Sequence, residues 1–204
     1  AVRTLRAGLE GEEESRFNDV MADPLGRVFC GTMASKKGKG SLYRLDTDGT
    51  ITKVVEGVGC SNGMGFTPDR KRMYYTDSGT REITIFDYDQ TSGALSNRQL
   101  FVKIPEGQGV PDGMTVDANG EVWGAQWDGW ACRRYNAAGV EQQMIKFPAK
   151  KVSSVVFGGA DYSDAYFTTA GGDKRADNGP HAGALYRIKG LTRGVPEFYS
   201  RLKV

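Results

Sequence analysis

The sequence predicts an all-β protein of the β-propeller type. Three observations predict it: glycine is abundant, helical periodicity is missing, and a turn followed by a short strand recurs along the chain. The 204 residues include 28 glycines, about double the roughly 7% share of an average protein. Abundant glycine without long apolar stretches indicates many tight turns that join many short strands.

The missing helical pattern excludes the helical repeat proteins. No window of about a dozen residues carries apolar side chains at helical spacing without an interrupting Gly or Pro. Solenoids with repeats of similar length are helical and require that pattern.

The recurring unit starts at a turn and continues as an alternating strand. The turns are 44, 50 and 42 residues apart and begin at Asp23, Thr67, Asp117 and Gly159. Second strands follow from about Gly40, Ile83, Ala131 and Gly183. A period of about 40–50 residues with several strands per unit is typical of propeller blades, which bury their faces by stacking around an axis. The chain is therefore expected to hold about four to four and a half blades.

The charge balance argues against a nucleic-acid partner, and the lack of a long apolar run argues against a membrane span. Lys and Arg number 27 against 25 Asp and Glu, a net charge of +2, whereas nucleic-acid binders usually show a larger and clustered basic excess. The basic run at 35–40 has no interleaved aromatic residue and is expected to be a solvated loop. No apolar run approaches the roughly 18 residues of a membrane span, and residues 1–6 do not resemble a signal peptide.

The three cysteines indicate buried free thiols in a cytoplasmic protein. Cys30, Cys60 and Cys132 are odd in number and irregular in spacing, which argues against a disulfide framework. No close pair of cysteines is present to hold zinc. Cys30 and Cys132 stand in strand-like runs, where a thiol behaves as a small apolar side chain.

Three polar clusters stand at the same phase of the repeat, each just before one of its turns. They occupy residues 15–20, 60–66 and 110–116. Equal phase in a propeller means equal height and equal distance from the axis, because rotation relates the blades. We therefore expect four side chains to converge at one mouth of the central channel: Arg16, Asn18, Asn62 and Asp112.

Two of these clusters allow a second interpretation. The pairs Asn62-Gly63 and Asp112-Gly113 are also strong signals for hairpin turns. Both pairs are followed by Met and by an alternating apolar strand. A turn does not need that repetition, so the recurrence favours a functional site.

Six short motifs stand in a fixed order along nearly the whole chain: Arg16-Phe17-Asn18-Asp19, Gly31-Thr32-Met33-Ala34, Ser61-Asn62-Gly63-Met64, Phe86-Asp87-Tyr88-Asp89, Pro111-Asp112-Gly113-Met114 and Phe157-Gly158-Gly159. In order and spacing they resemble the gluconolactonase, regucalcin and luciferin-regenerating-enzyme family. The resemblance implies a six-bladed propeller, of which residues 1–204 would form a single domain that is incomplete at its N-terminus.

The resemblance also implies one divalent cation near the axis. Calcium is expected, with Zn²⁺, Mn²⁺ and Mg²⁺ as alternatives. Carried over to this sequence, Asn62 and Asp112 are the metal ligands, Arg16 and Asn18 contact the substrate, and Asp19 supports the site without direct contact. The family's third metal ligand, a Glu, has no counterpart here, because Glu10, Glu12, Glu13 and Glu14 do not match its motif and are expected to be solvated.

The expected activity is metal-dependent hydrolysis of a sugar-acid lactone. A divalent cation can polarise the lactone carbonyl and activate a water, and Asp112 could accept the proton of that water. Without the third ligand, we expect the 204-residue chain alone to be a poor or inactive catalyst. Two alternatives stay open: a calcium-binding or regulatory propeller without turnover, and a related esterase or phosphotriesterase.

Several residues outside these motifs complete the expectations. Some family members carry an acidic substrate contact at the position of Lys36, so a Lys there would alter specificity. The single histidine, His181, is expected in a loop, and no GxSxG motif accompanies it. Trp123 is expected in the core, and Trp127 either packs between blades or offers a platform for a sugar ring. An incomplete ring would expose blade edges that invite self-association.

Overall fold

The structure is a computed structural model that describes residues 4–5, 8–172 and 175–203. Within these ranges the chain forms strands β1 to β15 and one short 3-10 helix. The strands are arranged as four antiparallel sheets. No helix of the described ranges is long and apolar enough to cross a membrane.

Each sheet is built from strands that follow one another in the sequence. The first sheet contains β1 (Phe17–Ala22), β2 (Val28–Thr32), β3 (Gly40–Leu45) and β4 (Ile51–Val58). The second contains β5 (Ser61–Phe66), β6 (Arg72–Asp77), β7 (Glu82–Tyr88) and β8 (Leu95–Lys103). The third contains β9 (Val110–Val116), β10 (Val122–Trp127), β11 (Ala131–Tyr135) and β12 (Glu141–Lys146). The fourth contains β13 (Lys151–Gly158), β14 (Asp164–Ala170) and β15 (Leu185–Ile188), with the 3-10 helix at Arg175–Asn178 between the last two.

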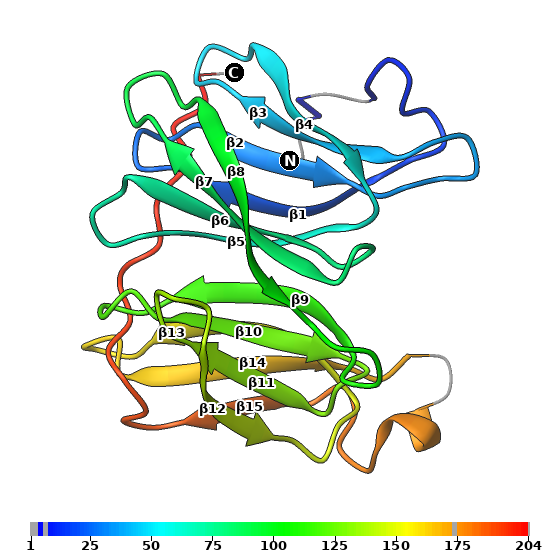
Figure 1. Ribbon diagram of the computed structural model, residues 1–204, viewed down its shortest axis with the longest axis vertical. Coiled ribbons are helices and arrows are strands. Elements are labelled where there is room, and N and C mark those ends of the chain that lie inside the picture. The colour runs from blue at the N-terminus through cyan, green and yellow to red at the C-terminus, as the bar shows by residue number, and fades with distance from the viewer. Residues whose placement is uncertain (1–3, 6–7, 173–174, 204) are drawn as a thin grey trace.

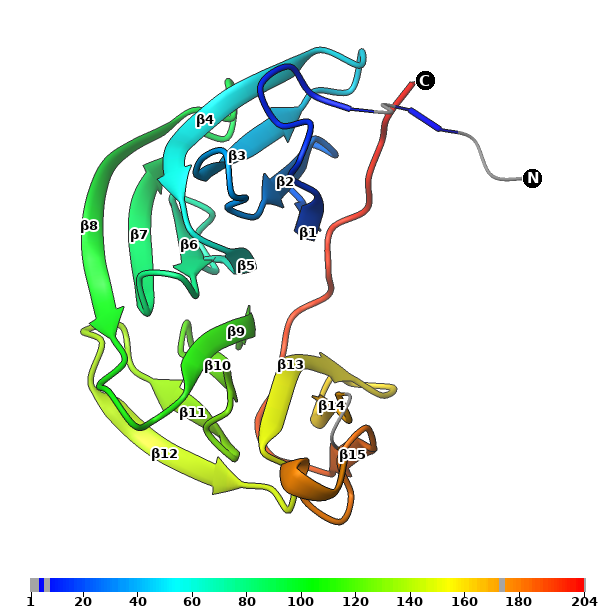
Figure 2. The ribbon, with the colours of Figure 1, turned by 90° about the vertical axis from the view of Figure 1, so that its right-hand side faces the viewer.

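The four sheets are stacked on one another as blades (Figure 1) and are arranged around a centre (Figure 2), which confirms the predicted all-β propeller. Figure 2 shows β1, β5, β9 and β13 innermost, with β4, β8 and β12 on the outer rim. The four predicted turns join the first and second strands of the four blades. Asp23 and Asp117 close two of these turns in the same way, because one carboxylate oxygen of each accepts two backbone amides.

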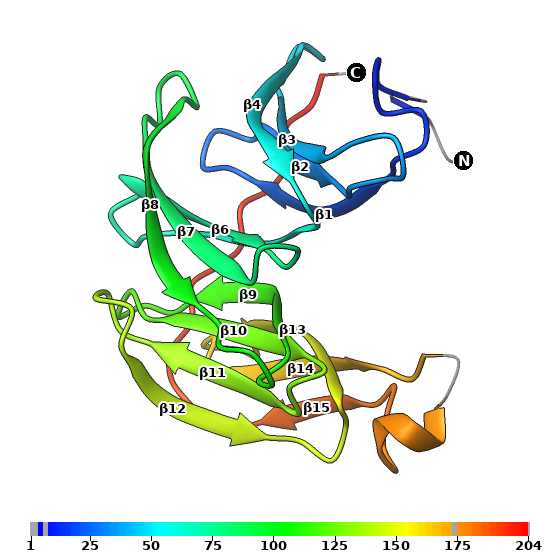
Figure 3. The ribbon, with the colours of Figure 1, turned by 45° about the vertical axis from the view of Figure 1, so that its right-hand side comes forward.

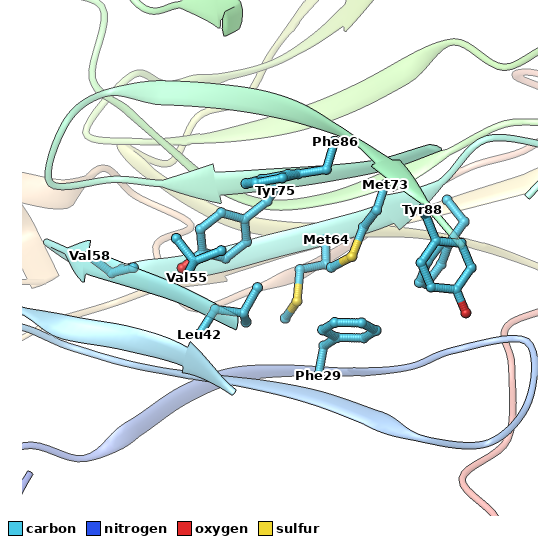
Figure 4. Packing of buried hydrophobic residues seen from close by; sticks show 10 residues of the cluster. Phe29, Leu42, Val55, Val58, Met64, Met73, Tyr75, Phe86 and Tyr88 are labelled. Atoms are coloured by element: carbon cyan, nitrogen blue, oxygen red, sulfur yellow. The ribbon is translucent and has the colours of Figure 1, made fainter. Parts of the chain in front are cut away.

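The hydrophobic core lies between neighbouring blades, in three clusters. Figure 4 shows the first, in which Phe29 and Leu42 of the first blade face Met64 and Met73 of the second. Trp123 is fully buried in the third cluster, as predicted. Alternating strands present one apolar face to each neighbour, so a blade is stable only when it is stacked.

Cys30 and Cys132 confirm the prediction of buried free thiols, since both are unpaired and buried. Cys132 is completely buried in the cluster between the third and fourth blades.

The last part of the chain crosses from the fourth blade back to the first (Figures 2 and 3). Its backbone bonds to several blade turns: Ala118 N donates to Arg193 O (2.8 Å) and Arg201 N to Gly26 O (2.9 Å). Phe198 packs edge-on against Phe66, with ring centres 5.9 Å apart. This segment therefore lies across the ends of the inner strands where the turns are.

Candidate functional site

The starts of the inner strands form the candidate site. Asn18 is the second residue of β1, Asn62 the second of β5 and Asp112 the third of β9. The three strands are neighbours around the centre (Figure 2). The equal phase of the sequence clusters is thus matched by equal height in the structure, at the end of the inner strands away from the turns.

Gly63 and Gly113 lie within strands, so the hairpin interpretation of both pairs is wrong. A β-carbon on Gly63 would lie 2.5 Å from Met114 N and 2.7 Å from Asp112 O, and one on Gly113 would lie 2.8 Å from Ser153 O. Glycine is needed here because neighbouring inner strands converge toward the axis. The close approach of β5 and β9 therefore occurs directly beside Asn62 and Asp112 in the sequence.

A chain of hydrogen bonds connects the site residues of the first two blades. Arg16 Nη1 donates to Asn18 Oδ1 (2.8 Å). Asn18 Nδ2 donates to Asn62 Oδ1 and to Ser61 O, both at 2.9 Å. The guanidinium of Arg16 is exposed, while Asn62 is buried. The structure therefore brings Arg16, Asn18 and Asn62 into one connected group that opens to solvent at Arg16.

Asp112 and Asp19 supply the negative charge of the site. Burial, followed by the charge of Asp19, raises the pKa of Asp112 to about 7. Burial also raises the pKa of Asp19, although Val20 N donates to its Oδ1 (3.0 Å). Asp19 lines a cavity of about 170 Å³ between the inner strands, together with Met64, Met114 and Ser154. The charge of Asp19 therefore opposes ionisation of Asp112.

Cys60 belongs to the site and was not predicted there. Its Sγ lies 3.7 Å from Asn62 Nδ2 and 3.9 Å from Asn18 Nδ2. Burial raises the pKa of the thiol first, and the charges of Asp112 and Asp77 raise it further. The sequence signal was its position directly before Ser61-Asn62, at the phase of the polar cluster.

Ser78 also belongs to the site and was missed. It follows β6, accepts a hydrogen bond from Asn62 Nδ2 (2.7 Å) and donates to Pro111 O (2.5 Å). In an antiparallel blade the end of the second strand returns to the start of the first. That rule could have directed attention to the segment after β6.

The donor atoms of the site suit a hard divalent cation in kind. Asp112 and Asp19 offer carboxylates and Asn62 offers an amide oxygen, which are the ligand types that calcium takes. The raised pKa of Asp112 reports a carboxyl group whose charge lacks compensation, and a bound cation would supply it. Among the described residues no group of three or more His, Cys, Asp or Glu could hold a metal ion. The residues present therefore fit part of a calcium coordination sphere.

Other residues discussed from the sequence lie around or away from this site. Lys36 and His181 are exposed. Trp127 is partly buried, and Lys151 Nζ stands 4.4 Å from its ring centre and 2.7 Å from Asp128 Oδ1. One face of Trp127 is therefore occupied by Lys151, and its use as a sugar platform stays a prediction.

Glu12 differs from the expectation of a solvated acidic run. Its carboxylate accepts a hydrogen bond from the Tyr43 hydroxyl (2.9 Å) and is partly buried, whereas Glu10, Glu13 and Glu14 are exposed. The tertiary contact with β3 decides this, because nothing local distinguishes Glu12 from its neighbours.

Comparison with known families identifies the relationship. The family model described as the SMP-30/Gluconolactonase/LRE-like region matches residues 2–171. The chain belongs to this family. The resemblance expected from the six motifs is thereby confirmed.

Two members of the SMP-30/gluconolactonase family show how much of a relative this chain spans. The Pentonolactonase XacC of Haloferax volcanii is 48% identical over 200 residues, which are 95% of this chain and 69% of that protein. The regucalcin of Gallus gallus is 37% identical over 196 residues, which are 90% of this chain and 66% of that protein. The chain thus spans about two thirds of the length of the curated relatives it matches.

Solved structures of family members share the fold. A luciferin-regenerating enzyme superposes with a TM-score of 0.86 at 31% identity, covering 94% of this chain and 67% of that one. A calcium-binding regucalcin of Agrobacterium tumefaciens gives a TM-score of 0.86 at 28% identity, covering 95% of this chain and 68% of that one.

Proposed function

We propose that this chain hydrolyses the lactone of a sugar acid at the mouth formed by β1, β5 and β9. The observation that carries the proposal is that Asn18, Asn62 and Asp112 stand at the starts of three neighbouring inner strands. There the two amides are hydrogen-bonded to each other, and burial raises the pKa of the Asp112 carboxyl group to about 7. A relative at 48% identity that bears the name pentonolactonase supports the substrate class.

Asp112 acts as the general base. A base works best when its pKa lies near the operating pH, because it can then both take up and release a proton. An ordinary Asp carboxyl group, with a pKa of 3.8, is too weak a base to take a proton from water at neutral pH. In the cation-free protein, burial and the charge of Asp19 move the pKa of Asp112 into the useful range, and a bound cation would lower it again.

Arg16 and Asn18 bind and orient the sugar ring. Arg16 is exposed at the mouth, and its guanidinium offers further donors beyond those given to Asn18 Oδ1 and Phe17 O. Hydrogen bonds to ring hydroxyls would hold the lactone carbonyl near Asp112, and such positioning lowers the entropic part of the barrier.

Asn62 and Asp112 would hold a divalent cation through oxygen atoms, with calcium as the first choice. When bound, such a cation polarises a carbonyl and acidifies a bound water. Asp19 would remain beside the ligands and add to the negative potential that attracts the cation.

The test follows ring opening of a pentonolactone and of gluconolactone by NMR. Enzyme is used at a concentration comparable with the substrate, so that even a slow single turnover is visible above uncatalysed hydrolysis. We expect ring opening above that background, its loss in Asp112→Ala and its decrease when a chelator is added.

Three results would contradict the proposed function. Lactone signals that broaden with the folded chain while no ring opening exceeds background would overturn hydrolysis and favour a binding propeller without turnover. Turnover of aryl esters or organophosphates in preference to lactones would overturn the substrate class. Asp112→Ala with undiminished turnover would overturn the role of Asp112.

A further inference from the structure

Ser78 connects two strands of the site through a single hydroxyl group. Its Oγ lies 2.7 Å from Asn62 Nδ2 in β5 and 2.5 Å from Pro111 O in β9. Pro111 directly precedes Asp112. One side chain from the segment after β6 therefore touches both the carboxamide of Asn62 and the backbone that carries Asp112.

The chemistry of these groups determines which way the Asn62 carboxamide points. A carbonyl oxygen can only accept a hydrogen bond, so the bond to Pro111 O uses the one hydrogen of the Ser78 hydroxyl. Ser78 can then offer Asn62 only a lone pair. The amide nitrogen of Asn62 must face Ser78, and its oxygen must face the opposite way, toward Asn18.

The far end of the chain of hydrogen bonds imposes the same direction. The Arg16 guanidinium only donates, so Asn18 turns its oxygen toward Arg16 and its nitrogen toward Asn62 Oδ1 and Ser61 O. The series of hydrogen bonds therefore ends in the donor-only guanidinium of Arg16 in the first blade and in the acceptor-only carbonyl of Pro111 in the third. Both amides between them have one allowed orientation.

Asp77 holds Ser78 in place from the neighbouring position. The buried carboxylate of Asp77 accepts hydrogen bonds from Gly59 N (3.0 Å), Cys60 N (2.9 Å) and Gly79 N (2.9 Å). The segment that carries Ser78 and the turn that leads into Asn62 therefore share one anchor. A hydroxyl placed on so constrained a backbone can act as a reference point for the amide it contacts.

We propose that Ser78 is a positioning residue that keeps Oδ1 of Asn62 directed into the site and holds Asn62 in register with Asp112. The identity of the ligand that benefits, a divalent cation, rests on the proposed function; the orientation of the amide does not. Without the hydroxyl, Asn62 Nδ2 loses its oxygen acceptor and keeps only the weaker sulfur acceptor Cys60 Sγ (3.7 Å). Pro111 O loses its donor, and the carboxamide is then free to turn its NH₂ group into the site.

The experiment compares wild type with Ser78→Ala, Ser78→Thr and the control Ser92→Ala. Ser92 lies in the turn between β7 and β8 of the same blade, where its hydroxyl also makes two hydrogen bonds. The first readout is the side-chain NH₂ signal of Asn62 in ¹H–¹⁵N NMR spectra, assigned by its loss in Asn62→Asp. The second is the dissociation constant of Ca²⁺ by calorimetry.

Ser78→Ala is expected to move the Asn62 NH₂ signal toward the solvent-exposed range and speed its exchange with water. It is expected to weaken Ca²⁺ binding about tenfold, the lower end of the effects seen for residues that hold a metal ligand in place. Ser78→Thr, which keeps the hydroxyl, and Ser92→Ala should leave both readouts near wild type. A role of Ser78 in fold stability alone would not produce this pattern, because it would leave the folded-state signal of Asn62 unchanged.

An Asn62 signal that is the same in Ser78→Ala and wild type would overturn the proposal. So would a shift of the signal in Ser92→Ala as large as that in Ser78→Ala. The NMR readout needs neither cation nor lactone. It therefore tests the role of Ser78 even if the chain does not bind Ca²⁺ or open a lactone. In that case only the proposed function fails.

Discussion

The charge of Asp19, in the inner strand of the first blade, helps to raise the pKa of Asp112, in the inner strand of the third blade, to about 7. Burial is the larger cause. The pair therefore carries less than its full negative charge at neutral pH in the absence of a cation. This relationship makes Asp112 a stronger base than an ordinary Asp.

Asp112→Asn is expected to stabilise the cation-free protein at alkaline pH. The folded-state pKa of about 7 exceeds the ordinary value of 3.8. Folding therefore loses stability as the pH rises between these values, and the loss is complete above pH 7. A shift of that size corresponds to about 4 kcal/mol, which partial solvent exposure reduces to about 2 kcal/mol.

Urea denaturation with a chelator present measures this effect at pH 8 and near pH 4. The gain should be present at pH 8 and become small near pH 4, where the carboxyl group is protonated in the folded state and only partly ionised in the unfolded state. A variant that is no more stable than wild type at pH 8 would contradict the raised pKa.

Gly63→Ala is expected to disturb the site by separating two inner strands. The new methyl group would meet the backbone atoms Met114 N and Asp112 O, which cannot move aside without shifting β9. We expect a loss of about 1–3 kcal/mol in unfolding free energy, as in overpacked cores, together with weaker Ca²⁺ binding. Gly38→Ala is the matched control, since nothing lies within 4 Å of its added carbon. Equal melting temperatures for the two variants would argue against the close approach.

Cys60 is expected to be the first thiol to react with an alkylating reagent in the native protein. Cys30 and Cys132 are buried, and burial raises the pKa of Cys30 to about 11. Reaction at Cys60 should be slow at neutral pH and accelerate as the pH rises, because only the thiolate reacts. Asp112→Asn should accelerate it, since the charge of Asp112 is the second cause of the raised pKa of Cys60. Mass spectrometry of peptides would reveal the contrary result, which is modification of Cys30 or Cys132 before Cys60.

Arg27→Ala is expected to destabilise the contact between the first two blades strongly. Arg27 Nε contacts Asp23 Oδ2 at 2.5 Å, and the two side chains are only 8% and 0% exposed. Arg27 also donates to the Tyr88 hydroxyl and to Gln90 O in the second blade. Its removal leaves the Asp23 carboxylate buried without its cation, which costs about 3–5 kcal/mol.

The control for this variant is Lys53→Ala, which breaks the exposed ion pair with Glu56. Exposed pairs contribute about 0–1 kcal/mol, so its denaturation midpoint should stay close to that of wild type. Similar midpoints for Arg27→Ala and Lys53→Ala would show that the buried pair does not hold the blades together.

The sequence alone determined the blades and the level of the candidate site. The turns at Asp23, Thr67, Asp117 and Gly159 recur because every blade needs the same hairpin, and rotation places residues of equal phase at equal height. Asn18, Asn62 and Asp112 could therefore be predicted to share one end of the inner strands. Their roles with cation and substrate stay predictions that rest on the family.

Only the tertiary structure decided what lies between the blades. Whether Gly63 is a turn or a point of close approach depends on the distance between β5 and β9, which no local pattern records. The same holds for Ser78, which reaches Asn62 and Pro111 across two blades, and for Glu12, which meets Tyr43. The physical reason is that alternation along a strand reports which face is apolar, whereas contacts across blades depend on how closely the sheets converge on the axis.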